Sequence, residues 1–313
     1  MEIVKKKILL DTDNGDDIDD LFTIYAMLNS PEFEVVGIIS SYLNTPLRAR
    51  QVKHVLKLAN REDIPVFAGC GRPIRGYHDR PMDYVYWQYE DILMKDEYRP
   101  NSDDVEGEEA INFMIECAKK YKDELYICEV APECTLGRAI RLDRDAFKDC
   151  HIYIMGGAFF EKASEWNIDC DFDAARTVFE SGLNLTYVGH NVTIKTEMNE
   201  EMYERFKSFK GDPYINYLIS ATELWKSFSK RRPMLHDPLT LLTIIYDDLC
   251  EFAISEFALV EKLEGRFSTF VEKGNTEYVV NDKFCKVRVA KSVNVDKTFE
   301  RLNNILKMNF YSK

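Results

Sequence analysis

The side chains most able to do chemistry form an acidic run near the start of the chain. Residues 11–20 read Asp-Thr-Asp-Asn-Gly-Asp-Asp-Ile-Asp-Asp and hold six carboxylates. Carboxylates this close repel one another, and a hard cation that takes oxygen ligands, such as Ca²⁺, would neutralise part of their charge. The same run could instead be a solvated acidic loop whose last acids lie favourably at a helix N-terminus.

The segments on both sides of the acidic run predict a strand, a turn and a helix. Residues 7–10 are short and apolar, as in a buried strand. Asn14 and Gly15 form a turn pair, and residues 21–28 carry apolar side chains at helical spacing. The acids therefore follow the C-terminal end of a strand, where open α/β sheets bind their ligands. This context favours a cation site over a solvated loop.

Two other motifs begin in a similar way. An EF-hand loop needs Gly at its sixth position and Glu at its twelfth. Counted from Asp11, these positions hold Asp16 and Phe22, which excludes that motif. Aspartyl-phosphate phosphotransferases also carry Asp-x-Asp after a strand, but they have Thr or Val where Gly15 stands. This second interpretation is weakened but not eliminated.

The composition is that of an acidic globular protein of 313 residues, long enough for one large α/β domain or two small ones. The formal net charge of −13 argues against nucleic acid or an anionic membrane as partner, and it suits a metal or a neutral or cationic ligand. We find neither a signal peptide nor an apolar run long enough to span a bilayer. The eight cysteines form no C-x-x-C pair, so we expect buried thiols and a cytoplasmic location.

The remainder of the chain alternates apolar runs with amphipathic helical segments. This alternation predicts an α/β fold with a mainly parallel central sheet flanked by helices. Beyond residue 251 the runs are short and alternate in polarity, so extra strands, partly antiparallel, are expected near the C-terminus. The expected strands are 7–10, 34–39, 64–68, 125–130, 151–155, 185–188, 252–260, 267–271, 278–280 and 287–289, and the expected helices are 21–28, 48–59, 108–121, 173–181, 212–228, 238–246 and 298–308.

No stretch of the chain has the composition of a boundary between domains. There is no linker rich in Pro, Gly or Ser, no internal repeat and no low-complexity segment, so we expect one domain over residues 1–313. Residues 71–106 are irregular and carry clustered aromatic side chains, namely Tyr84, Tyr86, Trp87 and Tyr89. This segment is either a lid over a pocket or a surface loop.

Polar side chains recur at the ends of the predicted strands. In a parallel sheet these ends meet at one edge, so the side chains could share a pocket. Outside the acidic run they belong to residues 41–44, Glu133, residues 165–167, His190, Asn191, His236 and Asp237.

Short motifs follow one another in a fixed order from Ile8 to about Ile305. After the Asp-Thr-Asp-x-Gly run and its later Asp-Asp come Ile-Met-Gly-Gly at 154–157, Glu-Trp-Asn-Ile at 165–168 and Asp-Phe-Asp-Ala-Ala at 171–175. They are followed by Val-Gly at 188–189, Val-Thr at 192–193, His-Asp-Pro at 236–238, Val-Arg-Val-Ala at 287–290 and Val-Asp at 295–296. In these motifs the chain resembles the inosine–uridine preferring nucleoside hydrolase family of calcium-dependent N-ribohydrolases.

The resemblance implies a nucleoside hydrolase-like fold and an enzyme that hydrolyses the N-glycosidic bond of ribonucleosides to free base and ribose with a Ca²⁺-bound water. Asp13, Asp20 and Asp237 would bind Ca²⁺ through their carboxylates, and a backbone carbonyl near Glu133 would be a further ligand. Asp13 would also be the general base for the water, and His236 would protonate the departing base. The surrounding carboxylates would stabilise an oxocarbenium-like transition state.

The same resemblance implies how the sugar is held. Asp19 would bind the ribose diol, and Asn44, Glu165 and Asn167 would hydrogen-bond ribose hydroxyls. His190, at the end of a predicted strand, is equally compatible with a structural and a substrate-facing role. The family also implies a homo-oligomer, dimer or tetramer, acting in purine or pyrimidine salvage.

The chain departs from the family pattern where substrate would bind. Asp16 and Asp17 precede the expected Asp pair, so either could take a role assigned to Asp19 or Asp20. The loop over 157–165 is short and lacks the Asn that often contacts the ribose 5′-hydroxyl in the family. The base preference, purine or pyrimidine, therefore stays open. A catalytically silent ribose- or metal-binding relative is the alternative function.

Overall fold

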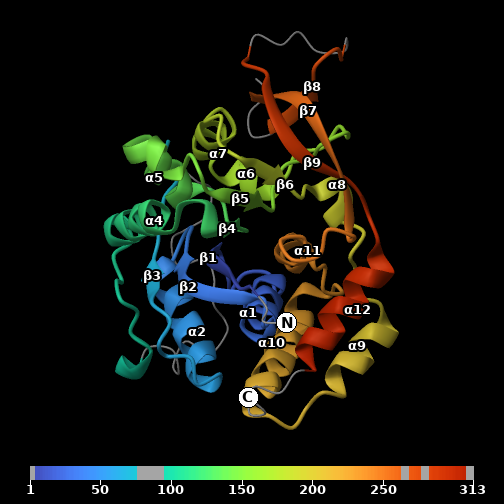
Figure 1. Ribbon diagram of the computed structural model, residues 1–313. Helices are drawn as coiled ribbons and strands as arrows, with labels where there is room; N and C mark the ends of the chain where they lie inside the picture. The colour runs from blue at the N-terminus through green and yellow to red at the C-terminus, as the bar shows by residue number, and fades with distance from the viewer. Residues whose placement is uncertain (1–3, 76–94, 262–267, 276–281, 308–313) are drawn as a thin grey trace.

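The computed structural model of the chain describes residues 4–75, 95–261, 268–275 and 282–307 (Figure 1). The aromatic residues clustered at 84–89 and the strand predicted at 278–280 lie outside these ranges. Within them, nine strands form one sheet in the order β3-β2-β1-β4-β5-β6-β9-β7-β8. Helices pack on both faces of the sheet, which confirms the predicted α/β architecture.

Six strands of the sheet run parallel to one another. β1 pairs with β2 and β4, β2 with β3, β4 with β5, and β5 with β6. Ile8, Leu9 and Leu10 of β1 are fully buried, because a parallel strand in the middle of a sheet is covered on both faces. Each of the six overlaps a predicted strand. They are β1 (Lys6–Thr12), β2 (Phe33–Ser40), β3 (Val66–Ala68), β4 (Leu125–Glu129), β5 (His151–Ile154) and β6 (Leu185–Tyr187).

Three further strands extend the sheet beyond β6. β9 (Cys285–Val293) lies parallel to β6, whereas β7 (Cys250–Glu261) lies antiparallel to β9 and to β8 (Ser268–Glu272). Figure 1 shows these strands projecting at one end of the molecule. They confirm the partly antiparallel strands expected near the C-terminus.

Two apolar cores lie on opposite faces of the sheet. Ile8 and Leu10 pack into one core and Leu9 into the other, because successive side chains of a strand point to opposite faces. The first core is covered by α1 (Asp19–Asn29), α2 (Thr45–Leu58), α10 (Pro213–Ser229), α11 (His236–Leu242) and α12 (Val295–Leu306), and the second by α4 (Glu108–Tyr121), α5 (Cys134–Asp143) and α7 (Phe172–Phe179) (Figure 1). The other helices described are α6 (Trp166–Cys170), α8 (His190–Thr193) and α9 (Glu200–Lys207), with 3₁₀ turns at Asp96–Tyr98, Lys122–Glu124 and Arg144–Phe147.

Local capping accounts for where several helices begin. The Asn44 side chain accepts a hydrogen bond from the Leu47 amide at the start of α2, and Asp212 accepts one from the Tyr214 amide at the start of α10. The helix predicted at 108–121 has these bounds in the structure, whereas α11 begins two residues before the predicted 238. In the described ranges, no helix combines the length and the apolar character that crossing a membrane requires.

Candidate active site

The carboxyl ends of the parallel strands open onto a cavity of about 920 Å³. Asp13 follows β1, Tyr42 follows β2, Val130 follows β4 and Met155 follows β5. A parallel sheet binds ligands at this edge. The lining residues are Asp13, Asp16, Asp17, Asp19, Asp20, Tyr42, Val130, Met155, Ser164, Glu165, Trp166, Asn167, Asp169, Cys170, His190, Ile194, Arg231, His236 and Asp237.

Three carboxylates converge in this cavity from two helix N-termini. Oxygens of Asp19, Asp20 and Asp237 lie within 4.8 Å of one another, and all three side chains are buried. Asp19 and Asp20 open α1, and Asp237 lies in the first turn of α11, where the helix dipole favours negative charge. The Asp237 amide donates to Asp19 Oδ2 at 3.4 Å. The arrangement brings together residues more than two hundred positions apart, as the strand-end pattern predicted.

The electrostatics of the three carboxylates match a cation site. Burial raises the pKa of Asp19, Asp20 and Asp237 well above the usual range, and the neighbouring carboxylates raise each of them further. Three buried anions at this separation are unfavourable unless protons or a cation neutralise them. The donors are hard oxygens, which fit a hard divalent cation better than a soft one. The residues present therefore fit a metal ion of that class.

Asp13 lies on the wall of the same cavity but outside the group of three. Its backbone amide donates to Asp20 Oδ1 at 3.1 Å. Burial raises the pKa of Asp13 to about 7, although the positive charge of Arg48 acts in the opposite direction. The prediction had Asp13 on the metal and Asp19 on ribose. The structure shows Asp19 in the convergent group, and the division of these two roles stays a prediction.

Arg48 is a site residue that the sequence analysis missed. Its side chain is fully buried. Nε donates to the Tyr42 carbonyl at 2.8 Å and Nη1 to the Asn14 carbonyl at 2.9 Å, so one guanidinium fixes two loops of the cavity. Tyr42 is held at a φ of 68°, and the next residue, Leu43, at 60°, a left-handed pair that costs free energy outside glycine. A charged residue on the apolar face of the predicted helix 48–59 was the available signal.

Glu165 and Asn167 form another wall of the cavity. The Glu165 carboxylate accepts hydrogen bonds from the amides of Asn167 at 2.9 Å, Gly157 at 3.0 Å and Ile168 at 3.2 Å, so it caps α6. Asn167 Nδ2 donates to the carbonyls of Val130 at 3.0 Å and Met155 at 3.1 Å. These bonds fix the amide and direct its donors into the protein, which leaves Oδ1 as the atom able to accept a hydrogen bond from a ligand.

Two histidines lie together on the cavity wall. The rings of His190 and His236 are nearly parallel, at an interplanar angle of 20° and a centroid distance of 6.2 Å. His236 Nδ1 lies 2.7 Å from Thr193 Oγ1, and His190 Nδ1 lies 2.8 Å from Glu161 Oε1. Burial lowers the pKa of His236 to about 4, with the charges of His190 and Arg231 adding to that effect. His236 is therefore neutral at pH 7.

The structure brings most of the predicted site residues into one cavity. Those that line it are Asp13, Asp19, Asp20, Glu165, Asn167, His236 and Asp237.

Asn44 and Glu133 do not line the cavity. The Asn44 side chain caps α2, and Tyr42 from the same loop reaches the cavity instead. The Glu133 carbonyl accepts the Gly137 amide at 2.8 Å inside α5. Val130, three residues earlier, lines the cavity and directs its carbonyl to Asn167. A backbone ligand from this segment would therefore come from Val130 rather than Glu133.

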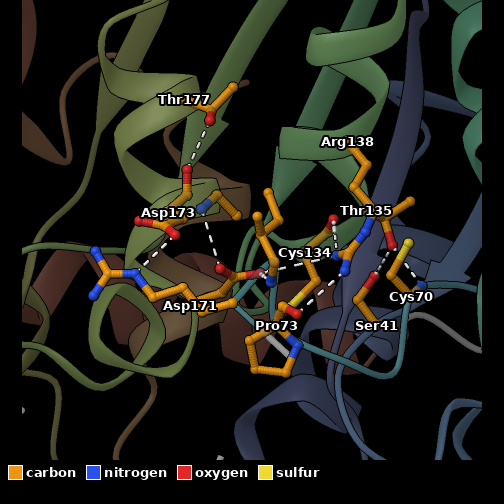
Figure 2. A network of polar contacts seen from close by, with 12 residues as sticks. Ser41, Cys70, Pro73, Cys134, Thr135, Arg138, Asp171, Asp173 and Thr177 are labelled. Carbon is orange, nitrogen blue, oxygen red and sulfur yellow. Dashed lines mark hydrogen bonds and ion pairs between the residues drawn. The ribbon is translucent and has the colours of Figure 1, made fainter. Parts of the chain in front are cut away.

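A polar network beside the cavity ties its loops together (Figure 2). Thr135 Oγ1 lies 2.6 Å from Ser41 Oγ and accepts the Cys70 amide at 2.9 Å, which joins the segments after β2, β3 and β4. Nearby, Asp171 caps α7 and lies 3.9 Å from Arg138 Nη1. The network holds the loops so that their side chains keep fixed positions around the cavity.

Comparison with known proteins agrees with this geometry. Residues 8–300 match the family model for inosine-uridine preferring nucleoside hydrolase. The probable uridine nucleosidase 2 of Arabidopsis thaliana is 32% identical over 264 residues, which cover 78% of this chain and 79% of that protein. The pyrimidine-specific ribonucleoside hydrolase RihA of Escherichia coli is 27% identical over 301 residues, 88% of this chain and 90% of that protein.

Solved structures give the same result. The plant nucleoside hydrolase PpNRh1 enzyme superposes with a TM-score of 0.76 at 25% identity, over 97% of this chain and 99% of that one. An inosine-guanosine nucleoside hydrolase superposes with a TM-score of 0.78 at 18% identity, which supports the fold alone. Since the family model covers nearly the whole sequence and a relative shares about a third of the aligned residues, the chain belongs to the inosine–uridine preferring nucleoside hydrolase family.

Proposed function

We propose that the chain hydrolyses the N-glycosidic bond of ribonucleosides in this cavity, releasing free base and ribose, with Ca²⁺ as its metal. Membership of the family makes it a nucleoside hydrolase. The observation that carries the assignment of the site is the convergence of Asp19, Asp20 and Asp237 in a cavity that Asp13 and His236 also line.

The residues that would hold the cation all offer oxygen. Asp20 and Asp237 would be carboxylate ligands, with Asp13 or Asp19 as the third and the Val130 carbonyl as a neutral one. Oxygen donors of this kind suit Ca²⁺, which accepts irregular geometry. When bound, the cation neutralises the repulsion between the carboxylates and makes water more acidic.

Asp13 is the residue to which we assign the role of general base. Asp13 lines the cavity, and its amide hydrogen-bonds Asp20 of the convergent group, so its carboxylate lies where it can accept a proton from an attacking water. As the bond between C1′ and the base nitrogen breaks, its electron pair moves to the base and the ribose ring gains positive charge. The surrounding carboxylates stabilise that charge, and Asp13 accepts the proton lost by the attacking water.

The two walls of the cavity suit the two parts of a nucleoside. Asn167 Oδ1 and the Asp19 carboxylate can accept hydrogen bonds from ribose hydroxyls, and Glu165 fixes the segment that carries Asn167. His236 also lines the cavity, and its ring can hydrogen-bond the departing base. Asn44 would need a different loop position to reach ribose.

A nucleoside panel tests the function. Purified enzyme with calcium is assayed for reducing sugar on uridine, cytidine, inosine and guanosine. Uridine is the first substrate to test, because the relatives at 32% and 27% identity are named for uridine or pyrimidine ribonucleosides. We expect ribose release from at least one member of the panel. Folded, calcium-loaded protein that releases ribose from none of them would instead be the catalytically silent relative.

We also propose a homo-oligomer, dimer or tetramer, located in the cytoplasm, on the strength of family membership and composition. Light scattering after size-exclusion chromatography measures the mass in solution. A mass equal to the 36.5 kDa chain at assay concentration would contradict the oligomer.

A further inference from the structure

His190 and Glu161 form a polar pair that has no part in the hydrolysis proposed above. His190, the first residue of α8, lines the cavity directly after β6. Its Nδ1 lies 2.8 Å from Glu161 Oε1, and each side chain is about one-third exposed, at 32%. His190 is therefore accessible from the cavity, and neither side chain of the pair is part of the apolar core.

The position of His190 is fixed by its backbone as well as by Glu161. The His190 amide donates to the Gly157 carbonyl at 2.8 Å. A Cβ on Gly189 would come within 2.5 Å of that same carbonyl oxygen, so the backbone approaches closely here. With Nδ1 held by Glu161, the imidazole has one nitrogen left for a ligand. That nitrogen is Nε2, on the opposite side of the ring.

The two cavity histidines differ in what holds their Nδ1 atoms. His236 Nδ1 meets the Thr193 hydroxyl, whereas His190 Nδ1 meets the Glu161 carboxylate. A carboxylate keeps a proton on Nδ1 and stabilises the positively charged ring, as in catalytic triads, and a hydroxyl does so much less. His236, whose ring centroid lies 6.2 Å from that of His190, is a further titratable group on the cavity wall, and Arg231 also lines the cavity. Of the two histidines, His190 has the better partner for donating a proton.

We propose that His190 is a further catalytic residue that contacts the nucleobase and donates its Nε2 proton as the glycosidic bond breaks, with Glu161 as its positioning residue. The inference rests on the proposed nucleosidase function. The electron pair of the broken bond stays on the base, which receives the His190 proton, while the attacking water transfers one proton to Asp13. Substrate and water thus yield neutral base and ribose, and the two side chains return to their starting states by exchange with solvent. The ligand class is a purine or pyrimidine base that leaves poorly as an anion.

The test compares leaving groups that do and do not need a proton. We expect His190→Gln to lower kcat on uridine and inosine by about 10²-fold or more, the usual scale for general acid catalysis. Activity on p-nitrophenyl riboside should stay within about threefold of wild type, because p-nitrophenolate leaves without protonation. The matched control is His151→Gln, since His151 also has its Nδ1 hydrogen-bonded, to Asn184 at 2.9 Å, but lies at the opposite end of its strand from the cavity. This control should leave both activities unchanged.

Variants of Glu161 test the positioning role. Glu161→Ala should show the same substrate-dependent loss as His190→Gln, and Glu161→Gln, which keeps an acceptor for Nδ1, should recover part of the activity. In the double variant, removal of Glu161 should add little to His190→Gln, because the two residues act as a unit.

The results distinguish failure of the acid role of His190 from failure of the proposed nucleoside hydrolysis. Wild-type enzyme inactive on p-nitrophenyl riboside as well as on nucleosides would contradict the proposed function itself. Wild type active on both, with His190→Gln equally impaired on both, would show that His190 only maintains the site and would overturn the inference. So would a His190→Gln variant with normal kcat on both substrates.

Discussion

Two groups of buried carboxyls lie near the carboxyl ends of the parallel strands and differ in their access to the cavity. The cavity acids open onto the pocket, and the interior acids do not. Both groups are at most 9% exposed, so burial alone does not distinguish them. The cavity acids are Asp13, Asp19, Asp20 and Asp237, and the interior acids are Asp11, Glu129 and Glu133.

The difference in access decides how each group can be neutralised. Burial raises the pKa of both Glu129 and Glu133 well above the usual range, and the charges of Asp11 and Glu133 add to the effect on Glu129. A cation from solvent can reach the cavity acids. The interior acids do not line the cavity, and burial favours their neutral, protonated form by raising the pKa of Glu129 and Glu133. The same residue type at similar burial therefore gives a candidate cation site in one place and a closed, polar core in the other.

Removing the metal should have the largest effect, and it should act on the cavity acids alone. We expect prolonged chelation to abolish turnover and to lower the melting temperature, because a ligand bound only to the native state stabilises it, by about 2.7 kcal/mol at a concentration 100 times Kd. Turnover and thermal melting with and without added calcium measure both effects. Full activity in calcium-depleted enzyme would remove the basis for treating the cavity acids as a cation site.

Asp13→Ala should give the next largest effect. Loss of a general base lowers kcat by about 10²–10⁴-fold. Steady-state kinetics on the best nucleoside measures it, and Asp16→Ala, also on the cavity wall, is the matched control. If Asp16→Ala or Asp17→Ala is inactive while Asp13→Ala is near wild type, the roles within the acidic run have been assigned to the wrong residues.

Glu129→Gln should stabilise the protein, and the gain should depend on pH. The unfolded carboxyl ionises near pH 4 and the folded one only at much higher pH, so above pH 4 the native state binds more protons and stability falls as pH rises. Gln is a neutral isostere of the protonated carboxyl, so the Glu129→Gln variant does not lose stability in this way as pH rises. The gain should be near zero at pH 4 and reach about 1–3 kcal/mol at pH 8.

Urea unfolding at pH 5 and pH 8, with calcium present, measures the Glu129→Gln difference. A gain that is equal at both values would mean that Glu129 is already ionised at pH 5 in the folded protein, so that its pKa is not raised. If the stabilisation by Glu129→Gln disappears on chelation, the interior acids and the cavity acids are energetically coupled. That result would contradict the separate neutralisation of the two groups.

Ser41→Ala should give the smallest effect. The Ser41 hydroxyl donates to Asp11 Oδ1 at 2.6 Å, and it is one of the groups that hold down the pKa of that interior acid. Its loss should cost about 1 kcal/mol of stability, as for a typical buried hydrogen bond, and leave the calcium requirement unchanged. Urea unfolding measures the loss of stability, and a calcium titration of turnover measures the calcium requirement.

The sequence sufficed for the parts of the fold that short-range patterns determine. The apolar runs 7–10 and 34–39 could be assigned because each is bounded by turn or polar residues, and both are strands of the sheet. Strand order then placed Asp13, Glu165 and His236 at one edge.

What could not be predicted depends on contacts between distant residues. Burial of Arg48 is visible only once two loops meet over it. Whether Val130 or Glu133 presents a carbonyl to the cavity depends on the path of the backbone after β4, which apolar periodicity does not encode. Asn44 was assigned to ribose from a motif, yet the Leu47 amide competes for its side chain as a helix cap.

The contact between the starts of α1 and α11 has a kinetic consequence. The hydrogen bond from the Asp237 amide to Asp19 spans 218 residues, so the site forms only when two distant parts of the chain meet. We expect a cation there to link the two helices after the rate-limiting barrier, because the contact is so distant in sequence. Calcium should then slow unfolding far more than it speeds refolding, so the loaded protein would persist through brief heating that the ion-free form does not survive.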